Sequence, residues 1–256
     1  MFKCRNAAHV TMHFCRISVL MSYTFVRENL LRVQERIAVA AHGAGRRAEE
    51  ITLIAVSKSH PAEAIRAGYE AGQRYFGENR VQEWEGKRGG LADLNASWHL
   101  VGHLQSNKCR DAVELFEMIQ SVDSLHVAQE INKRAEQAAK RMPILLEVNA
   151  VGEASKFGYR PEQLLAEFSQ ANALPRLEIQ GLMTVPPWAP EPEKTRHVFR
   201  TLRELKQKCE EILGAPLPHL SMGMTGDFEV AIEEGATIVR IGTGLFGERK
   251  SKAELL

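Results

Sequence analysis

The chain has 256 residues, a formal net charge of +1, 44% hydrophobic residues and 25% charged residues. These values are ordinary for a soluble globular protein. A net charge near zero does not indicate binding to nucleic acid or to an anionic membrane. No apolar run reaches the roughly 18 residues that a membrane span requires. The 4 cysteines are scattered without a CxxC pair, which favours reduced thiols of a cytoplasmic protein over a disulfide framework or a metal site.

The first twenty residues are basic and carry no carboxylate, since the first acidic residue is Glu28. An acid-poor, basic start is typical of an organellar presequence. We favour a plainer interpretation, in which translation starts at Met21, because a helical pattern begins directly after it. Residues 1–20 are then a poorly ordered upstream extension, and residues 21–256 form one domain.

A helical pattern begins at Ser22. Its apolar residues recur at steps of four and three, which places them on one face of a helix, and Gly43 and Gly45 end the pattern. We therefore expect an extra N-terminal helix ahead of the main fold. The residues of its apolar face are Val26, Leu30, Val33, Ile37 and Ala40.

Eight short apolar or β-branched segments then alternate with amphipathic helical patterns. This alternation favours an α/β fold with a parallel sheet, whose strands are nearly continuous apolar runs because helices cover them. Eight strands in this length favour a single (β/α)8 barrel of the TIM type, with a doubly wound open sheet as the alternative. The predicted strands span residues 52–58, 74–79, 97–103, 118–123, 143–149, 177–185, 219–224 and 237–244.

Lys58 ends the first predicted strand and shares a face with Ile54 and Val56, because side chains alternate along a strand. If that face lines a barrel, the amine is partly desolvated and becomes a better nucleophile toward an aldehyde. The alternative is a lysine that extends to solvent from the strand end. Lys58 is therefore a candidate for Schiff-base chemistry.

Polar residues and glycines gather at the carboxyl ends of the predicted strands, where barrels build their sites. Arg240 shares a face of the last strand with Ile238 and Gly242, so a second cation is predicted to point inward. Two inward cations suggest that an anion binds between them. An ion pair between Arg240 and Glu78 is the alternative.

A phosphate cradle is predicted at the ends of the last two strands, where barrels frequently bind phosphate. Glycines let backbone N–H groups approach phosphate oxygens, and serine or threonine hydroxyls add further donors. The residues that supply these groups are Ser221, Met222, Gly223 and Met224 after the seventh strand, and Gly242, Thr243 and Gly244 after the eighth.

Seven segments form an ordered set of motifs between residues 55 and 247, within a match that covers roughly residues 22–249. They are AVSKSHP (55–61), FGENRVQE (76–83), WHLVGHLQSNK (98–108), VNAVGEASKFG (148–158), GLMT (181–184), SMGMTGD (221–227) and VRIGTGLFG (239–247). Together they resemble the pyridoxal phosphate homeostasis protein family. This family has a fold-type III barrel related to the N-terminal domain of alanine racemase. It binds pyridoxal 5′-phosphate (PLP) and acts in vitamin B6 homeostasis, with no robust enzymatic activity established.

The resemblance implies that PLP is the cofactor and that Lys58 holds it as a covalent aldimine. It also implies that Arg240 faces the pyridine nitrogen and that Asn79 lies beside the ring. The phosphate would be held by Ser221, Gly242 and Thr243, with the backbone of Met222 and Gly223 completing the cradle. The family more often carries SMGMS followed by two acids, where residues 225–227 of this chain read TGD.

Three further residues invite functional hypotheses. His99 and His103 have the same parity on one predicted strand, as a metal-binding pair would. No carboxylate or cysteine is spaced to complete a zinc site, so we interpret both as structural. Lys156, on a predicted loop after the fifth strand, is a candidate second lysine that meets PLP transiently.

Two functions fit these features: a carrier or buffer that delivers PLP to PLP-requiring apoenzymes, and an amino-acid racemase. An arginine at the pyridine nitrogen leaves that nitrogen unprotonated, which weakens the ring as an electron sink and argues against transamination. Racemisation also needs a second acid/base, which alanine racemase takes from an appended domain across a dimer. We expect a cytoplasmic, monomeric carrier that is not an enzyme. A cofactor-free aldolase acting through Lys58 would leave the phosphate cradle without a purpose.

Overall fold

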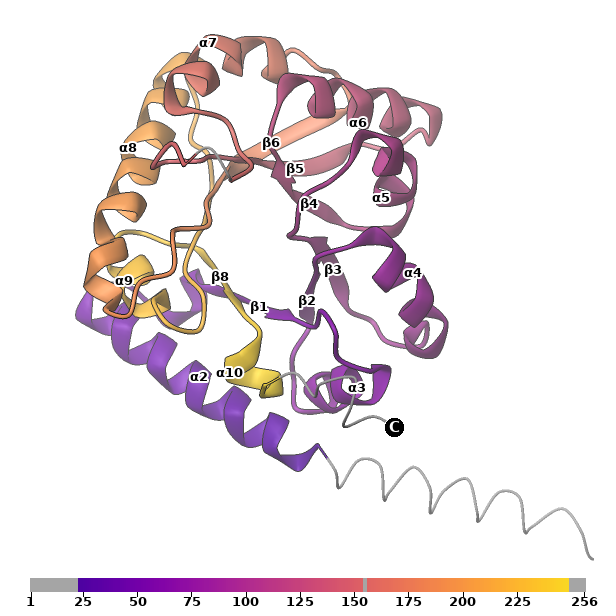
Figure 1. Cartoon of the computed structure of the whole chain (residues 1–256), viewed down its shortest axis with the longest axis vertical. Helices are drawn as coiled ribbons and strands as arrows, with labels where there is room; N and C mark the ends of the chain where they lie inside the picture. Colours follow the sequence, from indigo (N-terminus) through magenta and orange to yellow (C-terminus); the bar gives the residue numbers. More distant parts are fainter. Residues whose placement is uncertain (1–22, 154–155, 249–256) are drawn as a thin grey trace, which may run out of the picture.

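The computed structural model describes residues 23–153 and 156–248 (Figure 1). Within these residues eight parallel strands pair in chain order and close into a barrel, with β8 against β1. The closed (β/α)8 barrel is therefore confirmed over the open sheet. The strands are β1 (Thr52–Val56), β2 (Tyr75–Glu78), β3 (Ser97–Leu100), β4 (Met118–Val122), β5 (Met142–Glu147), β6 (Leu177–Met183), β7 (His219–Ser221) and β8 (Ile238–Ile241). The predicted extension, residues 1–20, lies outside the described residues.

Helices surround the barrel (Figure 1). They are α2 (Thr24–Gly43), α3 (Ala62–Glu70), α4 (Val81–Arg88), α5 (Cys109–Leu115), α6 (Leu125–Gln137), α7 (Pro161–Asn172), α8 (Arg196–Leu213), α9 (Phe228–Glu233) and α10 (Thr243–Phe246). Short 3-10 turns are η1 (Ala48–Glu50), η2 (Gly89–Leu91), η3 (Ser106–Lys108) and η4 (Pro192–Thr195). None of the helices in the described ranges has the length and apolarity that crossing a bilayer requires.

The extra N-terminal helix, α2, packs on α9, α10 and α3. Its predicted apolar face is buried from Val26 to Ala40, and the helix ends at Gly43 as expected. Burying a side chain such as Leu30 or Ile37 contributes about 1.5–3 kcal/mol. Asn29 Nδ2 also donates a hydrogen bond of 2.9 Å to the carbonyl of Leu245. The helix therefore supports α10, the short helix that follows β8.

The apolar core has two parts, separated by the barrel wall. Side chains of alternating parity face the inside, where Ile54 and Val56 of β1 meet Ile238 of β8 and apolar residues of other strands. The intervening residues, such as Leu53 and Ala55, pack outward against the helices. The predicted inward face of β1 is therefore confirmed.

Each predicted strand runs past the observed carboxyl end of its strand. The residues concerned lie outside the strands, in irregular segments, turns or the start of α10. Lys58, the last residue of the first predicted strand, lies on a turn, and Gly223 has a φ of 91°, which does not belong to a strand. Strand propensity alone does not reveal these turns, and they shape the candidate site.

Candidate functional site

A cavity of about 610 Å³ opens at the carboxyl ends of the strands. Five of the predicted site residues line it, namely Lys58, Asn79, Arg240, Gly242 and Thr243. The rest of the lining consists of Val56, His60, Val101, Lys156, Val185, Pro186, Pro187, Trp188, Ala189, Met224, Thr225, Gly226, Asp227 and Gly247. The barrel thus brings together residues that are up to 191 positions apart, from Val56 to Gly247.

The other three predicted residues, Ser221, Met222 and Gly223, lie behind this lining. Ser221 is fully buried against Arg240, and Met222 belongs to the core between barrel and helices. Gly223 has a left-handed φ of 91°, and a Cβ at this position would lie 2.6 Å from the Cβ of Ala231. The glycine is therefore needed for close packing of the loop against α9.

The loop after β7 reaches the cavity through residues 224–227. Asp227 Oδ1 accepts a hydrogen bond of 2.7 Å from the backbone N–H of Met224, which closes the loop. The backbone N–H of Gly244 donates to Thr225 Oγ1 at 3.3 Å. A Cβ at Gly244 would lie 3.0 Å from Thr225 Cγ2, so a glycine lets the two loops approach. Sequence reasoning treated Thr225 only as a departure from the SMGMS pattern, although a hydroxyl beside a glycine is itself a phosphate-binding signal.

Lys58 lies on a tight turn directly after β1. The backbone N–H of His60 donates to the carbonyl of Ser57 at 3.1 Å, and the intervening Ser59 has a φ of 64°. A positive φ is uncommon outside glycine and is typical of residues held in place at functional sites. The backbone N–H of Ser59 donates to Glu83 Oε1, which stabilises this conformation.

An ionic cluster lies behind the turn and is centred on Lys87. Its Nζ is 3.0 Å from the carbonyl of Ser57, 3.0 Å from Glu78 Oε1 and 2.6 Å from Glu83 Oε1. Ser57 Oγ donates to the same oxygen of Glu78 at 2.8 Å. Burial raises the pKa of Glu78, and the charge of Lys87 opposes that shift. The suggested ion pair between Glu78 and Arg240 is therefore wrong, because α4 supplies a nearer cation.

Arg240 projects from β8 and is only 3% exposed. Its Nη1 donates to Ser221 Oγ at 2.7 Å, and its Nη2 donates to the carbonyl of Thr184 at 2.8 Å. Burial lowers the pKa of Arg240 to about 10, against the opposing charges of Glu147 and Asp227. The guanidinium thus remains cationic at neutral pH, and its binding partners are uncharged.

Glu147 is the buried carboxyl that faces this cation at longer range. Burial and the charge of Asp123 raise its pKa to about 7, while Arg240 opposes the shift. Its Oε2 has no hydrogen-bond partner among the described residues. The carboxyl of Glu147 therefore changes its charge close to neutral pH, without a hydrogen bond to Arg240.

The Pro-rich stretch after β6, predicted as a surface loop, forms one wall of the cavity. Residues 185–189 line it, and the indole of Trp188 is 87% exposed at its rim. The backbone N–H of Thr184, just before this wall, donates to the carbonyl of Ser221 at 3.1 Å. The wall is thus attached to β7 at its start.

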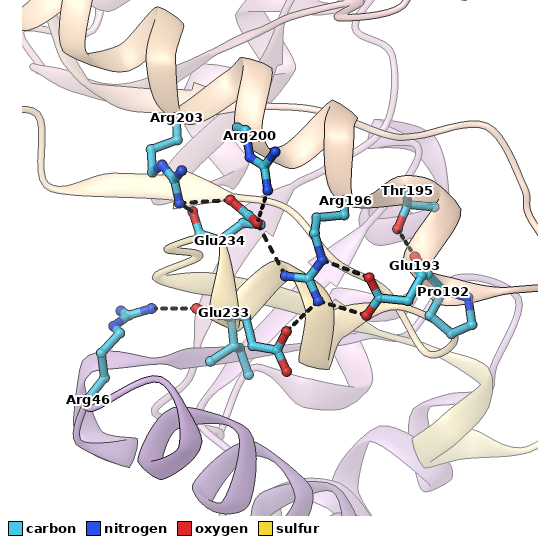
Figure 2. Close-up of polar contacts among 10 residues, drawn as sticks. Arg46, Pro192, Glu193, Thr195, Arg196, Arg200, Arg203, Glu233 and Glu234 are labelled. Atoms are coloured by element: carbon cyan, nitrogen blue, oxygen red, sulfur yellow. Dashed lines mark hydrogen bonds and ion pairs between the residues drawn. The ribbon is translucent and has the colours of Figure 1, made fainter.

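An ion-pair cluster holds the far end of the wall, where η4 leads into α8 (Figure 2). Arg196 donates hydrogen bonds of 2.7 Å to both carboxylate oxygens of Glu193. Arg196, Arg200 and Arg203 surround Glu234 at 3.2, 3.2 and 2.8 Å. Burial alone would raise the pKa of Glu234, but hydrogen bonds from Arg196 and Arg200 outweigh it and the pKa is lowered.

His99 and His103 have separate partners. His99 Nδ1 lies 2.9 Å from Gln120 Nε2 inside the barrel. His103 Nδ1 lies 3.0 Å from Asp123 Oδ2, and its ring stacks on Phe157 with centroids 3.6 Å apart. Within the described residues no three metal-binding side chains come together. The contacts agree with the structural interpretation of both histidines.

Lys156, the second lysine considered from the sequence, lines the cavity. Its Nζ lies 3.4 Å from Glu153 Oε2 and donates to the carbonyl of Val185 at 3.5 Å. The side chain therefore joins the loop after β5 to the wall after β6. It faces the same space as Lys58.

Comparison with known proteins gives close relatives along most of the chain. The family described as "Alanine racemase, N-terminal domain" matches residues 29–250. The "Pyridoxal phosphate homeostasis protein" of Aquifex aeolicus is 48% identical over 223 residues, which cover 87% of this chain and 98% of the relative. The protein of the same name from Pseudomonas aeruginosa is 45% identical over 224 residues, covering 88% and 96%.

Solved structures of related proteins have the same fold as this chain. PipY of Synechococcus elongatus PCC7942 with PLP bound is 39% identical, covers 87% of this chain and 100% of its own, and superposes with a TM-score of 0.77. An alanine racemase of Clostridium difficile 630, at 19% identity and a TM-score of 0.69, shares the fold, and this chain spans 57% of its length. The chain therefore belongs to the pyridoxal phosphate homeostasis protein family, with the barrel of the alanine racemase N-terminal domain.

Proposed function

We propose that this protein binds PLP in the cavity, holds it on Lys58 as a Schiff base, and acts in intracellular vitamin B6 homeostasis. The observation that carries the proposal is that Lys58 and Arg240 line one cavity with two glycine- and threonine-containing loops. PipY, which is 39% identical to this chain, has PLP bound in one of its structures. The lysine amine would add to the aldehyde carbon and water would leave, so no oxidant or reductant is required.

The donor set of the cavity fits the parts of PLP. A primary amine at Lys58 suits the aldehyde. Arg240 carries only N–H donors and is held by uncharged partners, so it suits an unprotonated pyridine nitrogen. Asn79, on the cavity wall, is proposed to lie beside the ring. The proposed phosphate-binding residues are Thr225, Gly226, Gly242 and Thr243.

The three residues behind the lining receive supporting roles in this proposal. Ser221 accepts a hydrogen bond from Arg240 and so acts on the ring end of the cofactor through that cation. Met222 and Gly223 set the course of the loop that carries Thr225 to the cavity. The phosphate cradle is thus proposed to start a few residues later than the motif SMG.

We further propose that the protein is a carrier, monomeric and cytoplasmic, that passes PLP to PLP-requiring apoenzymes. Bound PLP supplies an electron sink, and an arginine at its pyridine nitrogen makes that sink weak. The relatives are named as homeostasis proteins, which supports a function other than catalysis. The racemase alternative has one observation in its favour, since Lys156 brings a second amine to the cavity wall.

Two measurements on the PLP-loaded protein separate these functions. A carrier should reactivate a PLP-requiring apoenzyme in the presence of a phosphatase that destroys free PLP, and it should exchange no α-proton of any amino acid in D₂O. Exchange that depends on both Lys58 and Lys156 would establish the racemase alternative. Reactivation no faster than that by an equal amount of free PLP would contradict delivery.

A further inference from the structure

A chain of hydrogen bonds crosses the inside of the barrel behind Arg240. Arg240 Nη1 donates to Ser221 Oγ at 2.7 Å, and Ser221 Oγ donates to Gln120 Oε1 at 2.6 Å. Gln120 Nε2 lies 2.9 Å from His99 Nδ1, and His99 Nε2 lies 3.2 Å from Ser97 Oγ. The chain thus joins β8, through β7 and β4, to β3.

The direction of every hydrogen bond in this chain follows from Arg240. A guanidinium has only donors, so Ser221 must accept from it and has one proton left to donate. That proton goes to Gln120 Oε1, which turns the amide NH₂ toward His99. His99 Nδ1 must then accept, so its proton is on Nε2 and points to Ser97.

The surroundings keep His99 in this neutral form. The side chain is 6% exposed, and burial together with the charge of His219 lowers its pKa to about 4. A proton on Nδ1 would oppose the NH₂ of Gln120 and would force the amide to turn over. The hydroxyl of Ser221 would then lose the acceptor of its proton.

We propose that Gln120 and His99 are positioning residues for Arg240. They fix the hydroxyl of Ser221 as an acceptor, and Ser221 together with the carbonyl of Thr184 orients the guanidinium toward the pyridine nitrogen of PLP. The inference rests on the proposed function, because it assigns the group that Arg240 faces. Gln120 and His99 do not line the cavity, so their action is indirect.

Replacement of Gln120 tests the proposal. Gln120→Met fills similar space but removes the acceptor, so Ser221 and Arg240 lose their fixed orientation. We expect the Kd for PLP to rise about tenfold and the visible band of bound PLP to shift. Gln120→Glu keeps an acceptor for Ser221, so we expect it to restore the affinity and the band while raising the pKa of His99.

A matched control separates positioning from a loss of packing. Gln73 is also buried, at 6% exposure, and its Nε2 donates to the carbonyl of Leu53 at 2.7 Å, away from the chain described above. Gln73→Met should lower stability but leave the PLP band and Kd unchanged. Equal effects of Gln73→Met and Gln120→Met on the band would overturn the positioning role.

The cofactor-free protein gives a readout that is independent of PLP. Nitrogen NMR of ¹⁵N-labelled histidines should show His99 neutral at neutral pH with its proton on Nε2. A proton on Nδ1 would overturn the proposal. If the wild type binds no PLP, the proposed function fails and the NMR result still tests the chain; if Gln120→Met binds PLP like the wild type, only the positioning role fails.

Discussion

Ile54 on β1 pairs with Arg240 on β8 across the seam that closes the barrel. Further along the same pair of strands, a Cβ on Gly242 would lie 3.3 Å from the carbonyl of Val56. Lys58 follows Val56 by two residues and lies further along the strand direction than Arg240, which is level with Ile54. Both Lys58 and Arg240 line the cavity. A slip of one residue in this register would turn one of them out of the barrel.

Two glycines in the loop after β7 should differ in how much a substitution by alanine lowers the stability of the protein. Gly223→Ala forces a side chain onto a φ of 91° and into Ala231, so we expect a loss of about 2–4 kcal/mol in the free energy of unfolding. Gly226→Ala meets no atom within 4 Å, so its stability should stay within about 0.5 kcal/mol of the wild type. Urea unfolding of the cofactor-free proteins measures both, and equal stability of the two variants would contradict the described loop.

Glu147 predicts a pH-dependent stability. Its folded-state pKa is raised from 4.5 to about 7, so the folded chain binds its proton more tightly than the unfolded chain does. Stability from this group is therefore present below about pH 4.5 and is lost as the pH rises through 7. Glu147→Gln should be more stable than the wild type by about 1–3 kcal/mol near pH 8, with a small difference near pH 4.5. Unfolding curves at both pH values check this, and a pH-independent difference would refute it.

The ion-pair cluster on α8 predicts unequal effects for two of its carboxylates. The side chain of Glu234 is 6% exposed and meets three arginines, whereas that of Glu193 is 68% exposed. We expect Glu234→Ala to cost about 1–3 kcal/mol and to lower Tm by several degrees. Glu193→Ala should leave Tm nearly unchanged, because exposed ion pairs contribute little. Calorimetry of the two variants decides, and a larger effect of Glu193→Ala would contradict the assigned burial.

Much of the site could be predicted from strand parity. Ile54 and Val56 share the inward face of β1, and Ile238 and Arg240 share that of β8, so the inward arginine follows from a period of two. Lys58 lies on the turn after β1, so its place in the cavity lining depends on that turn as well. The N-terminal helix follows equally from its spacing. Both patterns depend only on residues close together in the chain, so they can be recognised in a single sequence.

The misplaced details depend on contacts between distant segments. Glu78 forms its ion pair with Lys87 instead of Arg240. This happens because α4 places Lys87 beside Glu78 and beside the carbonyl of Ser57, just after β1. Ser221 and Gln120 are 101 residues apart, and the barrel brings them to hydrogen-bonding distance. No spacing rule reveals such a pair.

The attachment of PLP to Lys58 is the central claim, and borohydride reduction tests it most directly. Reduction of the PLP-loaded protein followed by peptide mass spectrometry should place a phosphopyridoxyl group on the peptide that contains Lys58. Lys58→Ala should lose both the label and the visible band, and Lys156→Ala, which alters the other lysine lining the cavity in the described residues, should keep both. A label and band that persist in Lys58→Ala, or a wild-type label found only on another lysine, would contradict the account.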